Sequence, residues 1–163
     1  MSLRHGLILL LLTSLCACGF ELRGSNFETL RQSSVYVNAS GGNTLASEVR
    51  QQLQFADVPL ARTPADADYV VDISNETFDR KVLSVSAQTG KVEEYEIFYQ
   101  ARLSVTGPGG KKLINSEPIT AQRDYAFDSG AVLGSFDNEA VLQRDISKYA
   151  ASTVLRRLQA VTQ

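Results

Sequence analysis

The clearest pattern along the chain is an alternation of apolar and polar residues between positions 95 and 105. The apolar row consists of Tyr95, Ile97, Tyr99, Ala101, Leu103 and Val105. A strict period of two predicts a β-strand with one buried face. The opposite row is mostly polar and comprises Glu94, Glu96, Phe98, Gln100 and Arg102. We therefore expect this second face to meet solvent or a polar partner surface.

Three other segments favour strands. They lie at residues 34–37, 69–73 and 119–127. Beyond Asn75 the apolar positions change phase, which predicts a β-bulge or a strand that extends past the core. Pro118, near the expected start of the last strand, favours an edge position or the entry to the strand. Turns are expected at residues 88–90, where Gly90 suits a positive φ, and at residues 107–110.

Two segments repeat apolar residues every three or four positions, which is typical of an amphipathic helix. They cover residues 44–56 and about 135–158. Asn43 or Thr44 is the expected N-cap of the first helix, and Ser135 or Asp137 that of the second. The apolar stripe of the second helix comprises Leu142, Ile146, Tyr149, Ala150, Val154 and Leu158.

These elements follow one another in the order β-α-β-β-β-α. Three strands joined by short turns form an antiparallel unit, and the first helix brings the remaining strand alongside it. The expected fold class is α+β. It is a two-layer sandwich in which a four-stranded, mostly antiparallel sheet carries both helices on one face.

The chain opens with a short basic stretch and an uncharged apolar segment at residues 6–15. About ten helical residues span about 15 Å, half of a bilayer core, so the segment suits a secretory signal rather than a membrane span. The residues from Leu15 to Cys18 resemble the lipobox of bacterial lipoproteins. We expect a signal peptide over residues 1–17, lipidation at Cys18 and a single domain over residues 18–163. The alternative is an ordinary signal peptide with Cys18 incidental.

Lipidation at Cys18 has consequences for the rest of the chain. Cys16 leaves with the signal, so the mature chain cannot form an internal disulfide. Several acyl chains make membrane attachment effectively permanent. Gly19, rather than Asp, follows the cysteine, which by the usual bacterial sorting rule implies the periplasmic leaflet of the outer membrane.

The composition removes most catalytic chemistries. The one histidine, His5, lies within the expected signal. Ser-His-Asp catalysis, Cys-His catalysis and His-based metal sites are therefore excluded from the mature chain, as is thiolate chemistry once Cys18 is acylated. A formal net charge of −2 without a basic block argues against nucleic acid as a partner. The sequence predicts a non-enzymatic protein with no metal and no cofactor.

Carboxylates are the remaining catalytic candidates, and each has a structural interpretation. Residues 66–68 suit turn and cap chemistry, residues 93–96 suit a solvated strand face, and Asp128 lacks the alternating ligands of a calcium loop. Residues 107–112 are glycine-rich, but strands flank them and Pro108 removes an N–H, so a hairpin turn is favoured over a phosphate loop. A carboxylate hydrolase would need two inward-facing acids within about 10 Å.

Five short motifs occur in a fixed order. They are Cys18–Gly24, Gly90–Tyr95, Arg123-Asp124-Tyr125, Asp137-Asn138-Glu139 and Arg156-Arg157-Leu158. Their order and spacing resemble those of the lipopolysaccharide-assembly lipoproteins, the LptE family. The resemblance covers the chain from Cys18 to about Leu158.

The resemblance implies the same β-α-β-β-β-α sandwich and a non-enzymatic role. It implies an outer-membrane lipoprotein lodged as a plug inside the LptD β-barrel translocon. There it would assist barrel assembly and help to insert lipopolysaccharide into the outer leaflet. The implied partners are the LptD-type barrel, lipopolysaccharide and the outer membrane.

Lipopolysaccharide carries phosphates and acidic sugars, so its binding needs cations. The candidates are Lys91, Arg80 and Lys81 near the first hairpin and Lys111 and Lys112 at the second. Each can instead be a turn residue that confers solubility. The alternative function is an independent lipoprotein module that binds a small ligand or peptidoglycan between sheet and helices. That function requires an apolar pocket with convergent polar groups, and a solid core would argue against it.

Overall fold

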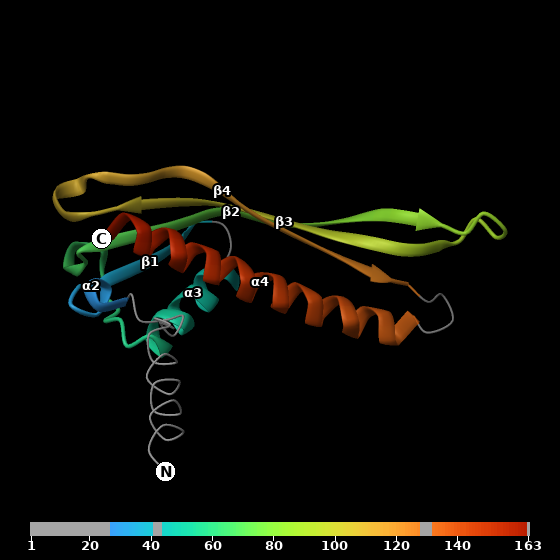
Figure 1. The fold of residues 1–163 in the computed structure, drawn as a ribbon, viewed down its shortest axis with the longest axis horizontal. Helices are drawn as coiled ribbons and strands as arrows, with labels where there is room; N and C mark the ends of the chain where they lie inside the picture. Colours follow the sequence, from blue (N-terminus) through green and yellow to red (C-terminus); the bar gives the residue numbers. More distant parts are fainter. Residues whose placement is uncertain (1–26, 41–43, 128–131, 163) are drawn as a thin grey trace, which may run out of the picture.

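The structure is a computed structural model that describes residues 27–40, 44–127 and 132–162, with the backbone alone described for residues 132–138. Four strands form one sheet in the spatial order β1-β2-β3-β4 (Figure 1). Their bounds are Val35–Ser40 for β1, Tyr69–Val85 for β2, Val92–Thr106 for β3 and Lys112–Ala126 for β4. β1 pairs with β2 in parallel, and the other pairs are antiparallel. The expected α+β class and mostly antiparallel sheet are confirmed.

Both long helices lie on the same side of the sheet (Figure 1). The helices are α2 at Glu28–Arg31, α3 at Thr44–Phe55 and α4 at Val132–Thr162, and 3-10 turns η2 and η3 occupy Pro64–Asp66 and Pro108–Gly110. α3 packs against α4, and α4 continues beneath β4. The single turn α2 was not expected, because four residues are too few to show a helical period.

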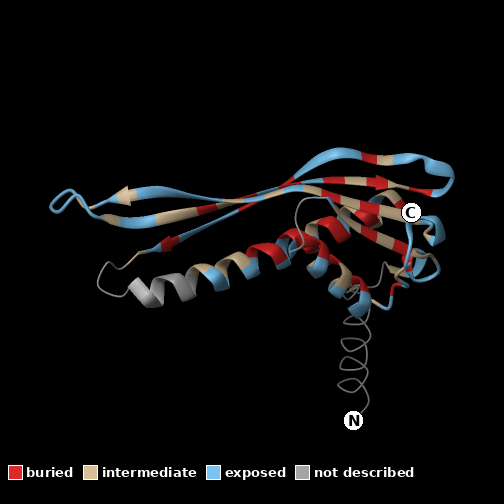
Figure 2. Cartoon of the chain, turned by 180° about the vertical axis from the view of Figure 1, so that it is seen from behind, coloured by how far each residue is buried: buried red, intermediate tan, exposed pale blue. Residues whose placement is uncertain are grey.

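The core lies between the sheet and the two long helices (Figure 2). On the sheet side, Ile97, Tyr99 and Leu103 are almost completely buried, as the alternating pattern predicted. On the helix side, Leu53 and Ile146 are completely buried. The far end of the β2–β3 hairpin is largely exposed, so the sheet is longer than the core that it covers (Figure 2).

The bulge expected beyond Asn75 is present. The pairing of β2 with β3 shifts register between Ser74 and Thr77, and Asn75 has a φ of 52°. Before the bulge, Ile73 is buried against the helices. After the bulge, Phe78 faces the helices instead, and its ring centre lies 4.7 Å from that of Tyr99. One inserted residue therefore moves the even positions of β2 to the helix side.

β4 is longer than expected and begins at Lys112 rather than near Ile119. The first half of β4 shows no alternation of apolar and polar residues, because the strand is irregular there. Ser116 has a φ of 52°, and the register with β3 shifts nearby. Pro118 lies inside the strand, opposite Arg102, and not near its start. β4 is an edge strand, as the proline indicated.

The expected start of α4 and one member of its stripe are wrong. The helix begins at Val132, so neither Ser135 nor Asp137 precedes it as an N-cap, and it continues to Thr162. Tyr149 is 47% exposed, whereas Ala150 and Ala151 are completely buried. Small side chains at the contact let the helix approach the sheet and α3 closely, which leaves the large ring on the flank. Among the described helices, none is long and apolar enough to cross a bilayer.

Candidate functional site

The β2–β3 hairpin extends beyond the helix-covered part of the sheet (Figure 1). Near its end, Val82, Leu83 and Val85 are 54%, 50% and 54% exposed. They lie in β2 past the bulge. Gly90 has a φ of 67° in the turn, the positive value expected of a glycine there. The hairpin thus ends in an exposed apolar surface, which we call the hairpin tip and define as Val82, Leu83 and Val85.

Two of the predicted cations border the hairpin tip. Lys91 is exposed at the end of the turn, where its backbone carbonyl accepts a hydrogen bond of 2.8 Å from the Ser86 N–H. Lys81 is exposed on the open face of the sheet, and its Nζ lies 5.1 Å from the ring centre of Phe98. The Lys81 ammonium therefore lies near an aromatic ring, and both lysines are exposed and accessible to an anionic ligand.

Arg80, the third cation on this hairpin, points to the other face and has a structural role. Its Nη1 donates a hydrogen bond of 3.1 Å to Glu139 Oε2 on α4. Its guanidinium lies 4.7 Å from the ring centre of Tyr95. The Tyr125 hydroxyl donates to the same Glu139 oxygen at 2.9 Å. This cluster, Arg80, Tyr95, Tyr125 and Glu139, joins the hairpin to β4 and α4.

The electrostatics of the cluster follow from these contacts. Hydrogen bonding with Tyr125 and the negative charge of Glu139 outweigh desolvation and raise the pKa of the Arg80 guanidinium. Burial, followed by the hydrogen bond to Glu139, raises the pKa of the Tyr125 hydroxyl. Arg80 is thus held charged and Tyr125 neutral at neutral pH. Arg80 is therefore a weaker candidate for ligand contact than Lys81 or Lys91.

Lys111 and Lys112 lie at the opposite end of the sheet. They follow η3 in the β3–β4 turn, whereas Lys91 lies at the start of β3. A strand rises about 3.3 Å per residue, so the two groups are about 50 Å apart along β3. The structure therefore separates the five candidate cations into two groups, which one headgroup cannot contact together.

Two of the acidic candidates, Asp66 and Asp68, have structural partners. Asp68 Oδ2 accepts 2.7 Å and 2.9 Å bonds from the Ser34 N–H and hydroxyl, and the bond from the Ser34 backbone leads in lowering the pKa of Asp68. Asp66 accepts a bond from Thr63 in its turn. Within the described ranges, no group of three acidic, histidine or cysteine side chains could hold a metal ion. Asp128 and Cys18 lie outside the described residues.

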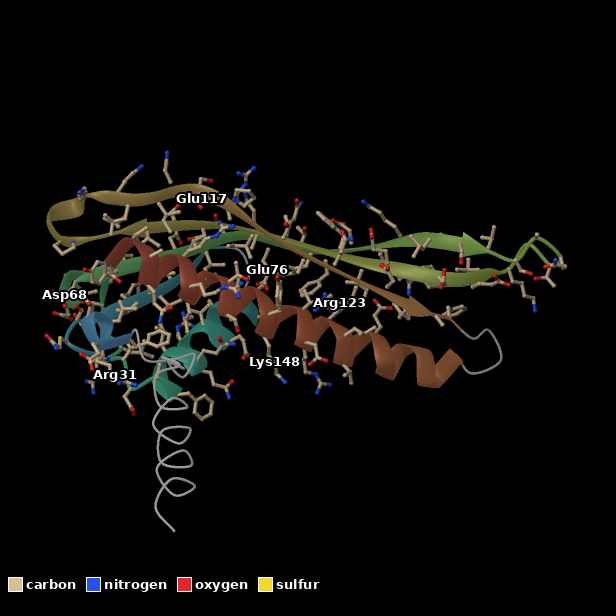
Figure 3. All side chains as sticks on the ribbon, viewed as in Figure 1. Arg31, Asp68, Glu76, Glu117, Arg123 and Lys148 are labelled. Carbon is tan, nitrogen blue, oxygen red and sulfur yellow. The ribbon has the colours of Figure 1, made fainter. Side chains whose placement is uncertain are left out.

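Sequence reasoning missed the role of Glu76. In the bulge of β2, its Oε1 accepts hydrogen bonds from the Leu45 N–H at 3.0 Å and from the Tyr99 hydroxyl at 3.2 Å (Figure 3). It therefore caps the start of α3 from 31 residues away along the chain. Burial and the nearby carboxylate raise the pKa of Tyr99. The only local signal was a polar residue at the change of phase.

Two grooves are found among the residues that the structure describes. One, of about 360 Å³, lies on the helix side and is lined by Phe27, Phe55 and Leu155 among others. The other, of about 200 Å³, lies at the edge of the sheet, between β1 and Arg50 of α3. Ile97, Tyr99 and Leu103 fill the space between the layers in the described part of the chain. The pocket required by an independent ligand-binding module is not found among these residues.

Solved structures of bacterial lipoproteins share this fold. Rare lipoprotein B from Shewanella oneidensis is 24% identical, with a TM-score of 0.67 over 78% of this chain and 94% of that chain. An uncharacterized lipoprotein B from Nitrosomonas europaea is 23% identical, with a TM-score of 0.72 over 88% of this chain and 92% of that chain. A minor lipoprotein from Acinetobacter baumannii is 22% identical, with a TM-score of 0.63 over 78% of this chain and 91% of that chain. At these identities the likenesses establish the fold alone.

The sequence itself carries the family assignment. No curated protein matches the chain. Residues 32–158, however, match the family LptE, which is described as lipopolysaccharide-assembly. The match includes both hairpins, Glu139 and most of α4. This chain therefore belongs to the lipopolysaccharide-assembly family LptE.

Proposed function

We propose that this chain is an outer-membrane lipoprotein that plugs an LptD-type β-barrel, assists its assembly and helps to insert lipopolysaccharide into the outer leaflet. The observation that carries the proposal is the family match over residues 32–158. A barrel of more than about twenty strands has a wide polar lumen that must be blocked. The polar open face of the sheet around Phe98 supports the proposal, because it suits such a wall.

The anchor is proposed at Cys18. Nine residues lead from Cys18 to Phe27, the first described residue, and an extended chain of that length reaches about 30 Å. This reach lets the folded domain enter a barrel while its lipid stays in the periplasmic leaflet. Acylation supplies permanent attachment, so binding to the barrel needs no membrane-spanning helix.

Contact with lipopolysaccharide is proposed at the hairpin tip. The ligand combines acyl chains with phosphates, and the hairpin combines Val82, Leu83 and Val85 with the cations Lys81 and Lys91. Apolar surface and exposed ammonium groups therefore match the two parts of the ligand. Lys111 and Lys112 form a separate, second basic group.

Co-purification tests the plug. Gentle solubilisation of outer membranes should recover the chain in a stoichiometric complex with a large β-barrel protein. The control is a barrel of similar size that has no role in lipopolysaccharide export. Recovery of the lipoprotein alone, under conditions in which other barrel complexes survive, would contradict the proposal.

A pair of charge reversals tests the ligand contact. Lys91→Glu should weaken binding of purified lipopolysaccharide about fivefold at low salt, because it replaces an attractive contact with a repulsive one. Arg62→Glu makes the same charge change at an exposed position outside both basic groups and should leave binding unchanged. Equal losses for both variants would show a non-specific charge effect and remove Lys91 as a site residue.

A further inference from the structure

The outer edge of β4 has two halves that differ in protection. Its first half contains Lys112, the irregular Ser116 and Pro118, which are features that prevent another strand from pairing with a sheet edge. Its second half, from Thr120 to Ala126, contains no proline and no lysine, and its pairing with β3 has no register shift. This second half is a regular strand seven residues long.

The register shows which backbone groups point outward. The Phe127 N–H donates to the Glu93 carbonyl, so the odd residues of this half direct their N–H and C=O groups at β3. The even residues then point away from the sheet. Pro118 agrees with this alternation. It is an even residue, so the N–H that proline lacks is one that would point away from the sheet, and its carbonyl, which also points outward, accepts a hydrogen bond of 3.1 Å from Arg157. Thr120, Gln122 and Asp124 therefore present outward amides, for which no hydrogen bond is found within the described residues.

Arg123 lies beside this open edge (Figure 3). Its guanidinium is 5.6 Å from the ring centre of Tyr149, and its Nη1 donates at 2.8 Å to the outward carbonyl of Gln122. In the part of the chain that the structure describes, Arg123 forms no ion pair. Tyr149 is 47% exposed on the same side. A cation and an aromatic ring thus border one flank of the edge.

We propose that the edge of β4 from Thr120 to Ala126 docks an extended segment of a partner protein, which adds to the sheet as a fifth strand and places a carboxylate opposite Arg123. The outward amides and carbonyls supply the main-chain hydrogen bonds of strand addition. Residues paired across two strands point to the same face, so the side chain opposite Arg123 lies on its helix-facing side. A carboxylate there pairs with the guanidinium, and apolar neighbours contact Tyr149.

The register provides a sharp variant. Gln122→Pro removes one outward N–H and obstructs strand addition, yet it leaves the β3–β4 hydrogen bonds intact because Pro118 already occupies the same phase of the strand. Gln122→Ala is the matched control, since it changes the side chain and keeps the amide. Thr120→Pro is a second variant of the same kind. The urea denaturation midpoint of each variant checks that it remains folded.

The probe is a synthetic dye-labelled peptide, Thr-Val-Thr-Glu-Thr-Val-Thr, and its counterpart with Lys at the centre. Binding to the full chain in detergent is measured by fluorescence anisotropy, and hydrogen exchange locates it. We expect the Glu peptide to slow exchange in residues 120–126, with affinity unchanged in Gln122→Ala and about tenfold weaker in Gln122→Pro. Arg123→Glu should reverse the preference between the two peptides.

Three binding results would each overturn the proposal. The Glu peptide could fail to bind wild type, or it could bind wild type and Gln122→Pro with equal affinity. The Lys peptide could also bind wild type as tightly as the Glu peptide does. A wild-type dimer in sedimentation that Gln122→Pro abolishes would also overturn it, because the edge would then pair with a second copy of this chain.

Discussion

Glu139 should be the residue that fastens the projecting hairpin to the body of the protein. Its carboxylate accepts bonds from Arg80 at 3.1 Å and from the Tyr125 hydroxyl at 2.9 Å. The Arg80 side chain is 44% exposed, so its half of the interaction contributes only about 0.5 kcal/mol. The Tyr125 hydroxyl belongs to a residue that is 7% exposed, and leaving it without an acceptor costs about 1–2 kcal/mol. Glu139→Ala should therefore lower the free energy of unfolding by about 2 kcal/mol.

Urea denaturation of the mature chain measures this loss. A change of about 2 kcal/mol corresponds to a midpoint about 1 M lower. Glu139→Gln keeps an acceptor for Tyr125 and should cost about 1 kcal/mol. The double variant with Tyr125→Phe should cost less than the sum of the single variants, because the two residues share one hydrogen bond.

Glu117 offers a matched control. It forms an ion pair with Arg157 at the same distance, 3.1 Å, but its side chain is 52% exposed, and within the described residues no tyrosine hydroxyl donates to it. Glu117→Ala should cost no more than about 0.5 kcal/mol. Equal losses for Glu117→Ala and Glu139→Ala would show that the hydrogen bond from the buried Tyr125 makes no difference to the free energy of unfolding.

Two further outcomes are expected. Cys18→Ala should abolish metabolic labelling with palmitate and leave the precursor uncleaved by the lipoprotein signal peptidase. A variant that still carries label would show that another residue is acylated. Burial raises the pKa of Tyr99 above the ordinary 10.0, so the folded state favours the neutral phenol. The stability that this preference contributes is complete below pH 10.0 and is lost as the pH rises through the raised pKa. Between about pH 8 and about pH 11, the free energy of unfolding of Tyr99→Phe should therefore fall by about 1 kcal/mol less than that of wild type in urea titrations, and an equal fall would contradict the assignment.

The sequence predicted those elements whose apolar period is unbroken. β3 alternates without interruption from Tyr95 to Val105, and α3 keeps its apolar period throughout. The bounds of β3 were therefore placed within three residues and those of α3 within one. The bulge of β2 was also visible, because one inserted residue changes the face on which every later apolar side chain lies. Periodicity is a local signal, and it suffices wherever one side of an element is buried along its length.

The misplaced boundaries lie where burial is incomplete. The first half of β4 is mostly exposed and distorted at Ser116, so its residues show no alternation. α4 begins at Val132, but its N-terminal part extends under the hairpin rather than under the core (Figure 1). Tyr149 was assigned to the apolar stripe by the helical period, together with Ala150, and only the packed structure shows that the small residue takes the buried position.

The candidate site was predictable in its charges and not in its contacts. Lys81 and Lys91 are exposed, as basic residues near a turn should be. Arg80 has the same local sequence signal, but a partner 59 residues away on α4 determines its role. The capping of α3 by Glu76 is likewise a contact between distant residues. No spacing rule along one sequence can find such pairs, because they depend on how the elements pack.

We propose that this chain acts by filling a barrel rather than by catalysis. Photo-crosslinking from Gln100, which is exposed on the open face of the sheet, probes this role in intact cells. The expected product is an adduct between this chain and a large outer-membrane β-barrel protein. A chain that reaches the outer membrane at its normal level and forms no barrel adduct from Gln100, or from other positions on the open face, would rule this role out.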